Sequence, residues 1–117
     1  MADLTYRAMT AADIPATLAL WRSIPGLALD AADEPAALAA FLERNPELSE
    51  VALANGNIIA TLLCGEDGRR ATFYHLAVAE HWRGHGIAHH LLTRAENRLR
   101  ARGITKMRRI GQNGGCF

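Results

Sequence analysis

The residues best able to do chemistry lie in one short segment that follows an apolar run and opens a helical pattern. Arg83 is followed by Gly84 and Gly86, and Ala88 stands two residues further on. A loop that leads into a helix gathers free backbone N–H groups at one spot, and that spot suits an anion. Glycine and alanine leave room for a ligand's phosphates, and Arg83 stands at the loop entrance. The segment therefore predicts a phosphate-binding loop, although Gly84 and Gly86 would also suit a plain tight turn.

Two well-known phosphate loops do not fit this segment. A Rossmann loop would need a third small residue where His89 stands, and an acidic residue about 20 positions later, where the chain has 106–109, Lys-Met-Arg-Arg. A Walker loop needs Gly-Lys followed by Ser or Thr, which occurs nowhere in the sequence.

Histidines surround the loop, and one of them precedes it within the apolar run. His81, His85, His89 and His90 lack a His-Glu-x-x-His arrangement, so we expect polar residues near an anion site and no metal site. His75 has two interpretations. It is either a core histidine paired with a neighbour or a general base for an incoming ammonium group.

The elements that must position these residues follow from periodicity and turn signals. Strands are predicted at 4–8, 50–54, 57–64, 70–79 and 104–110, and a helix at about 86–102. Asn55-Gly56 predicts a hairpin between the second and third strands. Strand 70–79 is apolar on both sides, with Phe73 and Ala77 expected on one face and Tyr74, Leu76 and Val78 on the other. It should therefore be central and covered on both sides.

Two further helices begin with the same pattern, near residues 10 and 30. Each copy has two capping candidates three residues apart, then an early proline and an apolar helical face that ends on Trp21 in one copy and Phe41 in the other. Two copies are too few for a solenoid. We interpret Trp21 and Phe41 as core anchors and not as ligand contacts.

Size and composition limit the class of protein. A chain of 117 residues, half of them hydrophobic, is expected to form a single domain over 1–117. The sequence shows no membrane span and no signal-peptide pattern at its start, so a cytoplasmic location is expected. Cys64 and Cys116 are isolated, which argues against a disulfide framework or a zinc site.

The net charge of +1 hides a division between the two parts of the chain. Residues 1–66 carry a net charge of −6 and residues 67–117 carry +7, which predicts a positive field around the proposed phosphate loop. Arg94, Arg98 and Arg100 give the predicted helix a basic face, which could alternatively contact nucleic acid. We do not expect a nucleic-acid partner, because no helix at helix-turn-helix spacing precedes it.

The apolar run and the loop together resemble a known signature. Leu76-Ala77-Val78, a spacer of four residues and Arg83-x-x-Gly86-x-Ala88 are similar to the acetyl-CoA signature of the GNAT N-acetyltransferase superfamily. The resemblance implies an α/β (α+β) fold with a mixed, mostly antiparallel sheet flanked by helices. It also implies a bulge in the strand before the loop, whose backbone bonds the pantetheine arm. The residues that it assigns to acetyl-CoA are Leu76, Ala77, Val78, Arg83, Gly84, His85, Gly86, Ile87 and Ala88.

The resemblance also implies a reaction. It indicates an acetyl-CoA-dependent N-acyltransferase that acetylates a primary amine, in a small molecule or a peptide, with segment 23–29 lining the acceptor pocket. His75 is the candidate catalytic residue.

The chain departs from the family pattern after strand 104–110. GNAT domains continue with an asparagine-bearing loop, a helix that carries a catalytic tyrosine and a final strand, whereas here residues 111–117 close the sequence. Neither Tyr6 nor Tyr74 stands at the family's tyrosine position, and Asn113 has no fixed counterpart. We therefore expect a domain that lacks the last helix and strand, and a homodimer that covers the open edge of strand 104–110. Two alternatives stay open: a catalytically impaired acyl-CoA-binding or regulatory module, and a truncated product that needs a partner.

Overall fold

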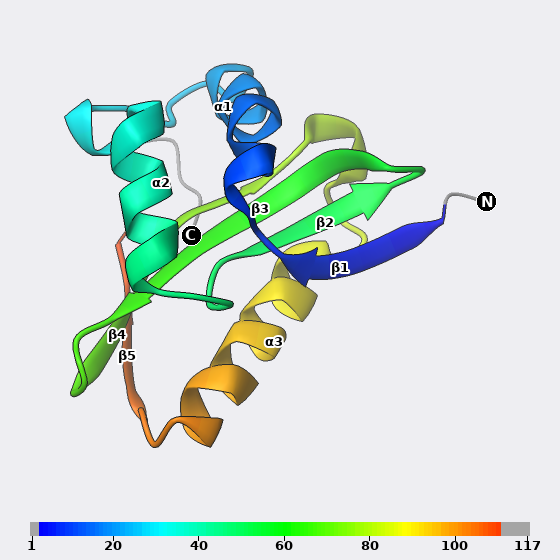
Figure 1. Ribbon diagram of the computed structural model, residues 1–117. Coiled ribbons are helices and arrows are strands. Elements are labelled where there is room, and N and C mark those ends of the chain that lie inside the picture. The colour runs from blue at the N-terminus through cyan, green and yellow to red at the C-terminus, as the bar shows by residue number, and fades with distance from the viewer. Residues whose placement is uncertain (1–2, 111–117) are drawn as a thin grey trace.

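The computed structural model describes residues 3–110, which form one sheet with helices on both of its faces (Figure 1). The strands are β1 (Leu4–Ala8), β2 (Glu50–Ala54), β3 (Asn57–Glu66), β4 (Arg70–Val78) and β5 (Lys106–Arg109). The α-helices are α1 (Ile14–Arg22), α2 (Pro35–Arg44) and α3 (Ile87–Ala101), and short 3-10 turns cover Ala11–Asp13, Ala31–Asp33 and Glu80–Trp82. The predicted strands and helices are confirmed: β1 and β2 have the predicted bounds, and the ends of β3, β4, β5 and α3 differ from the prediction by at most two residues. The helices expected to begin near residues 10 and 30 begin at Ile14 and Pro35, each after a 3-10 turn.

The sheet is mixed and mostly antiparallel, as predicted. Its strand order is β1-β2-β3-β4-β5, and only the β4–β5 pair is parallel. Asn55 and Gly56 join β2 to β3 with φ angles of 52° and 84°, the left-handed conformations that a tight hairpin requires.

Each face of the sheet has its own core. Under α3, the apolar residues of the helix pack on β2, β3 and β4 around the fully buried Leu91 and Leu99. On the opposite face, α1 and α2 pack over the sheet around Trp21, which is also fully buried. The interpretation of Trp21 as a core anchor is confirmed. Phe41 is half-buried and packs against the edge of the same cluster.

The face assignment predicted for β4 is wrong, because a bulge interrupts the strand. Phe73 and Leu76 pack under α3, whereas Tyr74 and Ala77 pack on the side of α1 and α2. Thr61 pairs with Ala77 and Leu63 pairs with Tyr74, so two residues of β4 stand opposite one residue of β3. His75, in the bulge, has a φ of 47°. One extra residue reverses the inward and outward alternation beyond it.

The repeated pattern before α1 and α2 is a capping device. Asp13 Oδ2 accepts the backbone N–H of Thr10 at 2.8 Å, and Asp33 Oδ2 accepts that of Asp30 at 3.1 Å. Each aspartate satisfies a backbone donor at the start of a 3-10 turn, and an α-helix with an early proline follows. Asp13 also pairs with Arg7.

Two of the three arginines of α3 are directed at the body of the protein, and Arg100 is exposed. Arg94 and Arg98 both bind the carboxylate of Glu50 in β2, and Arg98 also donates to the carbonyl of Glu47 at 2.6 Å. Arg102, which directly follows the helix, donates to the carbonyl of Pro46 at 2.6 Å. The expected basic face of α3 is therefore largely occupied in holding the helix to the turn before β2.

Candidate functional site

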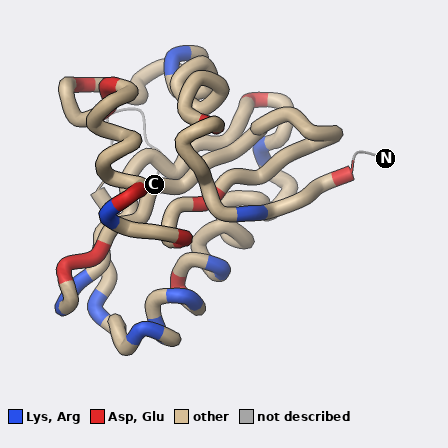
Figure 2. Tube along the Cα trace, viewed as in Figure 1, with Lys and Arg blue, Asp and Glu red and all other residues tan. Residues whose placement is uncertain are grey.

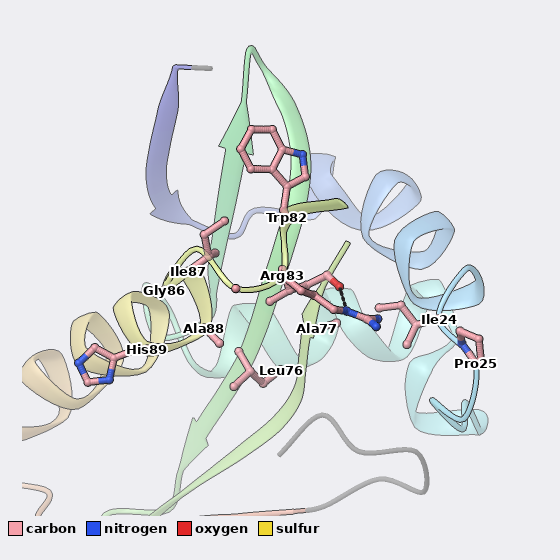
Figure 3. A pocket seen from close by; sticks show the side chains of 12 residues that line it. Ile24, Pro25, Leu76, Ala77, Trp82, Arg83, Gly86, Ile87, Ala88 and His89 are labelled. Atoms are coloured by element: carbon pink, nitrogen blue, oxygen red, sulfur yellow. Dashed lines mark hydrogen bonds between the residues drawn. The ribbon is translucent and has the colours of Figure 1, made fainter. Parts of the chain in front are cut away.

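The loop predicted from the sequence borders a cavity of about 470 Å³. Three parts of the chain enclose it: the end of β4, the loop with the start of α3, and the connection between α1 and α2 (Figure 3). The lining residues are Ile24, Pro25, Leu76, Ala77, Val78, Trp82, Arg83, Gly84, Gly86, Ile87, Ala88 and His89. We call this space the loop cavity.

Internal hydrogen bonds fix the shape of the loop. Arg83 Nε donates to the carbonyl of Val78 at 3.2 Å, which ties the loop back to the end of β4. In Figure 3 the Arg83 side chain extends across the cavity toward Ile24. His85 Nδ1 lies 3.0 Å from the carbonyl of Arg83 and 3.1 Å from that of Trp82. His85 is therefore part of the loop's internal structure and does not line the cavity.

The start of α3 offers backbone donors to the cavity. The first intrahelical bond runs from His90 N–H to the carbonyl of Gly86 at 3.1 Å, so the N–H groups of 87–89 have no acceptor within the helix. Gly84 and Gly86 have φ angles of 81° and 76°, which side chains rarely adopt. A Cβ added at either glycine would meet no atom within 4 Å, so the space beside the backbone is open. This arrangement can bind an anion.

The edge of β4 is open beside the loop cavity. β5 pairs with β4 from Arg70 to Phe73 only. Beyond that point, no strand of residues 3–110 pairs with this edge of β4, while β3 continues to pair with the other edge. Backbone groups of 76–78 can therefore bind an extended ligand that lies along the strand.

The positive charge of the second part of the chain does not converge on the loop cavity. Among the Lys and Arg residues, only Arg83 belongs to the lining. The other Lys and Arg residues of 67–117 gather along α3 and toward β5 (Figure 2), where Glu50 binds Arg94 and Arg98. Recognition of an anion would depend on the helix start and Arg83, and not on a broad basic surface.

A second cavity, of about 350 Å³, lies beside the same strand. It is lined by Ala28, Leu29, Asp30, Ala32, Asp33, Leu38, Phe41, Leu63, Tyr74, His75 and Ile110. We call it the His75 cavity. The apolar segment 23–29 therefore contributes to both spaces: Ile24 and Pro25 line the loop cavity, and Ala28 and Leu29 line the His75 cavity.

His75 lies in a buried polar cluster at the wall of the second cavity. It is 5% exposed, its Nε2 lies 2.9 Å from Asp33 Oδ1, and its ring centroid lies 4.6 Å from that of Trp21. The predicted pairing of His75 with a neighbour is therefore observed. His75 also lines the cavity, so its position is compatible with proton transfer to or from a ligand there. Asp33 was missed as a partner, because the sequence explained it fully as a capping residue.

The described residues contain neither a cluster that could hold a metal ion nor a reactive thiol. In the part of the chain that the structure describes, no group of three or more His, Cys, Asp or Glu residues could hold a metal ion. Burial raises the pKa of the Cys64 thiol to about 12, so Cys64 is not a nucleophile at neutral pH. Among residues 3–110, no helix combines the length and the apolar character that a membrane span requires. Asn113 lies outside the described residues.

Comparison with curated proteins finds acetyltransferases among the relatives of this chain. The chain is 42% identical over 66 residues to an acetyltransferase from Yersinia pestis (strain Pestoides F), an alignment that covers 56% of this chain and 47% of that protein. The chain thus spans about half the length of the curated relatives it matches.

Solved structures share the fold at low sequence identity. The PaiA N-acetyltransferase of Thermoplasma acidophilum, solved in complex with coenzyme A, superposes with a TM-score of 0.80 at 16% identity, covering 93% of this chain and 80% of that one. The diaminobutyrate acetyltransferase EctA of Paenibacillus lautus, solved with its substrate and coenzyme A, gives a TM-score of 0.69 at 22% identity, covering 83% and 58%.

The family itself is established by a broader match. The model of the acetyltransferase (GNAT) family matches residues 15–113, which is most of the chain and includes the whole of β4, the loop and α3. The resemblance inferred from the sequence is thereby confirmed, and so is the fold that it implied. The chain belongs to the GNAT family of acetyltransferases.

Proposed function

We propose that this domain transfers an acetyl group from acetyl-CoA, bound in the loop cavity, to a primary amine bound in the His75 cavity, and that it does so in the cytoplasm. The observation that carries the proposal is the contiguity of the two cavities along β4. Tyr74 and His75 line one, and 76–78 line the other. An amine and a thioester that occupied the two spaces would meet at the bulge.

The coenzyme's phosphates would bind at the start of α3. The free N–H groups of 87–89 and the guanidinium of Arg83 supply donors, and the open space beside Gly84 and Gly86 lets phosphate oxygens approach the backbone. His85 would support this loop through its contacts to backbone carbonyls and would not touch the coenzyme.

The acyl arm would lie along the open edge of β4. Backbone groups of Leu76, Ala77 and Val78 would hold it in an extended conformation. A backbone N–H that points at the thioester oxygen would polarise the carbonyl and stabilise the charge that develops on this oxygen during attack.

The lining of the His75 cavity suits a small amine with an apolar body. Leu29, Leu38 and Phe41 supply apolar surface, while Asp30 and Asp33 supply carboxylates that attract an ammonium group. The fold relative EctA was solved with L-2,4-diaminobutyric acid, so a diamine belongs among the first acceptors tested.

Two measurements test the proposal. Calorimetry should show coenzyme A binding to the protein, and mixing with acetyl-CoA should release free thiol only when a suitable amine is added. The amines to test are amino acids, diamines, peptides with a free N-terminus and aminoglycosides. Because Cys64 is buried and its thiol has a pKa of about 12, it should not react with the thiol reagent in the folded protein. Binding without amine-dependent release from any acceptor would contradict an enzymatic function.

That contradicting result would favour the second candidate function, an acyl-CoA-binding or regulatory module. The observation that favours a binding module is that neither Tyr6 nor Tyr74 lines the loop cavity. Tyr6 packs on His90 with 4.1 Å between ring centroids, and Tyr74 packs edge-on against Phe41. A tyrosine that protonates the departing thiolate is therefore not found among residues 3–110 at this cavity.

Replacing Tyr74 with phenylalanine should leave the turnover rate within a few-fold of the original. The ring contact with Phe41 is retained, and only the hydroxyl is lost. A loss of the size that removal of a general acid causes, about 100-fold or more, without weaker acetyl-CoA binding would show that Tyr74 protonates the thiolate. Thiol-release kinetics at saturating acetyl-CoA measure this, with Tyr6→Phe as the matched control.

We also propose that two copies of the chain associate through β5. Three of the four residues of β5 are exposed, and its outer edge pairs with no strand of residues 3–110. Pairing of two such edges would join the two copies by backbone hydrogen bonds, although the charges of Lys106 and Arg108 weaken the tendency. Light scattering should give the mass of a dimer, and a clean monomer at high concentration would contradict the proposal.

A further inference from the structure

Asp33 and His75 form a buried polar pair at the wall of the His75 cavity. The structure brings together residues that are 42 positions apart in the chain, from a 3-10 turn and from the bulge of β4. Both side chains are more than nine-tenths buried, yet both line the His75 cavity. A carboxylate and an imidazole at one cavity wall can exchange protons with a ligand in that cavity.

The hydrogen bonds define which nitrogen of His75 is free. Asp33 Oδ1 is an acceptor, so the nitrogen that faces it, Nε2, carries the proton in the neutral imidazole. Nδ1 then holds a lone pair, and it is buried without a hydrogen-bond partner among residues 3–110. An unpaired buried acceptor is unfavourable, because it has lost its hydrogen bonds to water without gaining others. A ligand that supplies an N–H group would remove that cost.

Several contacts hold the ring in this orientation. Trp21 packs against it with the two rings tilted by 58°, and Trp21 Nε1 donates to Thr61 Oγ1 at 2.8 Å. The hydroxyl of Thr61 donates in turn to the carbonyl of His75 at 3.4 Å. The left-handed conformation of His75 turns its side chain to the face of α1 and α2, where Asp33 lies.

We propose that His75 is the base of the acetyl transfer and that Asp33 is its positioning residue. This inference rests on the function proposed above. The ammonium form of the acceptor gives one proton to Nδ1, and the resulting imidazolium is stabilised by the Asp33 carboxylate. The amine nitrogen then forms a C–N bond with the thioester carbon. The C–S bond breaks, the second proton of the nitrogen passes to the thiolate, and His75 releases its proton to solvent.

The test compares His75→Asn and Asp33→Asn with a matched control, Asp13→Asn. Asparagine tolerates the left-handed backbone conformation of His75. Asp13 occupies the same capping position as Asp33 and is equally buried, at 7% exposure each, but it pairs with Arg7 and not with a histidine. Loss of capping should therefore affect Asp13→Asn and Asp33→Asn alike. Only Asp33→Asn should affect the reaction.

The expected results separate catalysis from folding. His75→Asn should lower kcat by about 100- to 10,000-fold and leave the affinity for acetyl-CoA unchanged. Asp33→Asn should lower kcat by a smaller factor, and Asp13→Asn should leave it unchanged in the folded fraction. In the free protein, nitrogen NMR of the imidazole should show the proton of neutral His75 on Nε2, and Asp33→Asn should reduce that preference.

Each contradicting result has a distinct meaning. If the original protein releases thiol with an amine and His75→Asn does so equally fast, the inference is overturned and the proposed function stands. A proton on Nδ1 of neutral His75 would overturn it as well, whatever the activity. If no amine in the panel supports thiol release by the original protein, the proposed function is wrong and the inference falls with it.

Discussion

Replacing Gly86 with valine is expected to weaken coenzyme A binding by about 100-fold or more while the protein stays folded. Valine places a branched side chain in the open space beside the backbone, where the ligand's phosphates would lie. Hydrogen bonds to charged groups contribute about 1.5–3 kcal/mol each, and 1.4 kcal/mol is about a tenfold change in affinity. Loss of two such bonds at the start of α3 is enough for the expected effect. Calorimetry with coenzyme A measures it.

The backbone strain of this substitution needs its own control. Gly86 has a φ of 76°, and valine there costs about 1–3 kcal/mol in strain alone. Gly68 has a φ of 90° in the exposed turn between β3 and β4, and its Cβ position is equally open. Gly68→Val should therefore lose similar stability in urea unfolding without losing coenzyme A affinity. Unchanged affinity in a folded Gly86→Val variant would show that the loop does not hold the phosphates.

The loop could be predicted because its information is local. The glycines, the small residue at 88 and the preceding apolar strand are consecutive in the chain, and their backbone requirements do not depend on distant contacts. The same is true of the hairpin at Asn55-Gly56 and of the two capping aspartates. In each case one residue type satisfies a dihedral angle or a hydrogen bond within three or four positions.

The faces of β4 were assigned wrongly because the alternation of apolar and polar residues along a strand does not reveal where one extra residue is inserted. Tyr74, His75 and Leu76 are all compatible with a strand, and the registers on the two sides of the bulge differ by one. The resemblance to the family implied a bulge but did not place it. Its position decides that Leu76 packs under α3 and that Ala77 packs on the opposite face.

Long-range polar pairs could not be predicted either. In the sequence Asp33 is explained as a capping residue and Glu50 looks like an ordinary surface carboxylate, while Arg94 and Arg98 look like a solvated helix face. In the fold, Glu50 is completely buried between the two arginines, which lie 44 and 48 positions away. Only the packing of α3 on β2 brings these charges together, and no periodicity within either element contains that information.

The cluster of Glu50, Arg94 and Arg98 leads to the largest expected effect on stability. Glu50 has 0% exposure, whereas each arginine side chain is 31% exposed and reaches water with part of its length. Replacing both arginines with methionine would leave a buried carboxylate without a cation. Such a loss costs about 3–5 kcal/mol. The double variant should lower the free energy of unfolding in urea by that amount, while Arg100→Met, at an exposed position on the same helix, should change it by about 0.5 kcal/mol or less.

Restoring charge balance in the double variant should recover most of this stability. Glu50→Met added to Arg94→Met and Arg98→Met replaces the whole cluster with apolar side chains. Such replacements of a complete buried ion cluster are often neutral or stabilising. Glu50→Met alone should cost less stability than the double variant, because the two arginines can turn toward solvent.

Two outcomes would contradict this account of the cluster. If the double variant loses no more stability than Arg100→Met, the buried carboxylate does not need its cations. Failure of the triple variant to recover would instead show that the arginines hold α3 through the carbonyls of the turn before β2, such as that of Glu47.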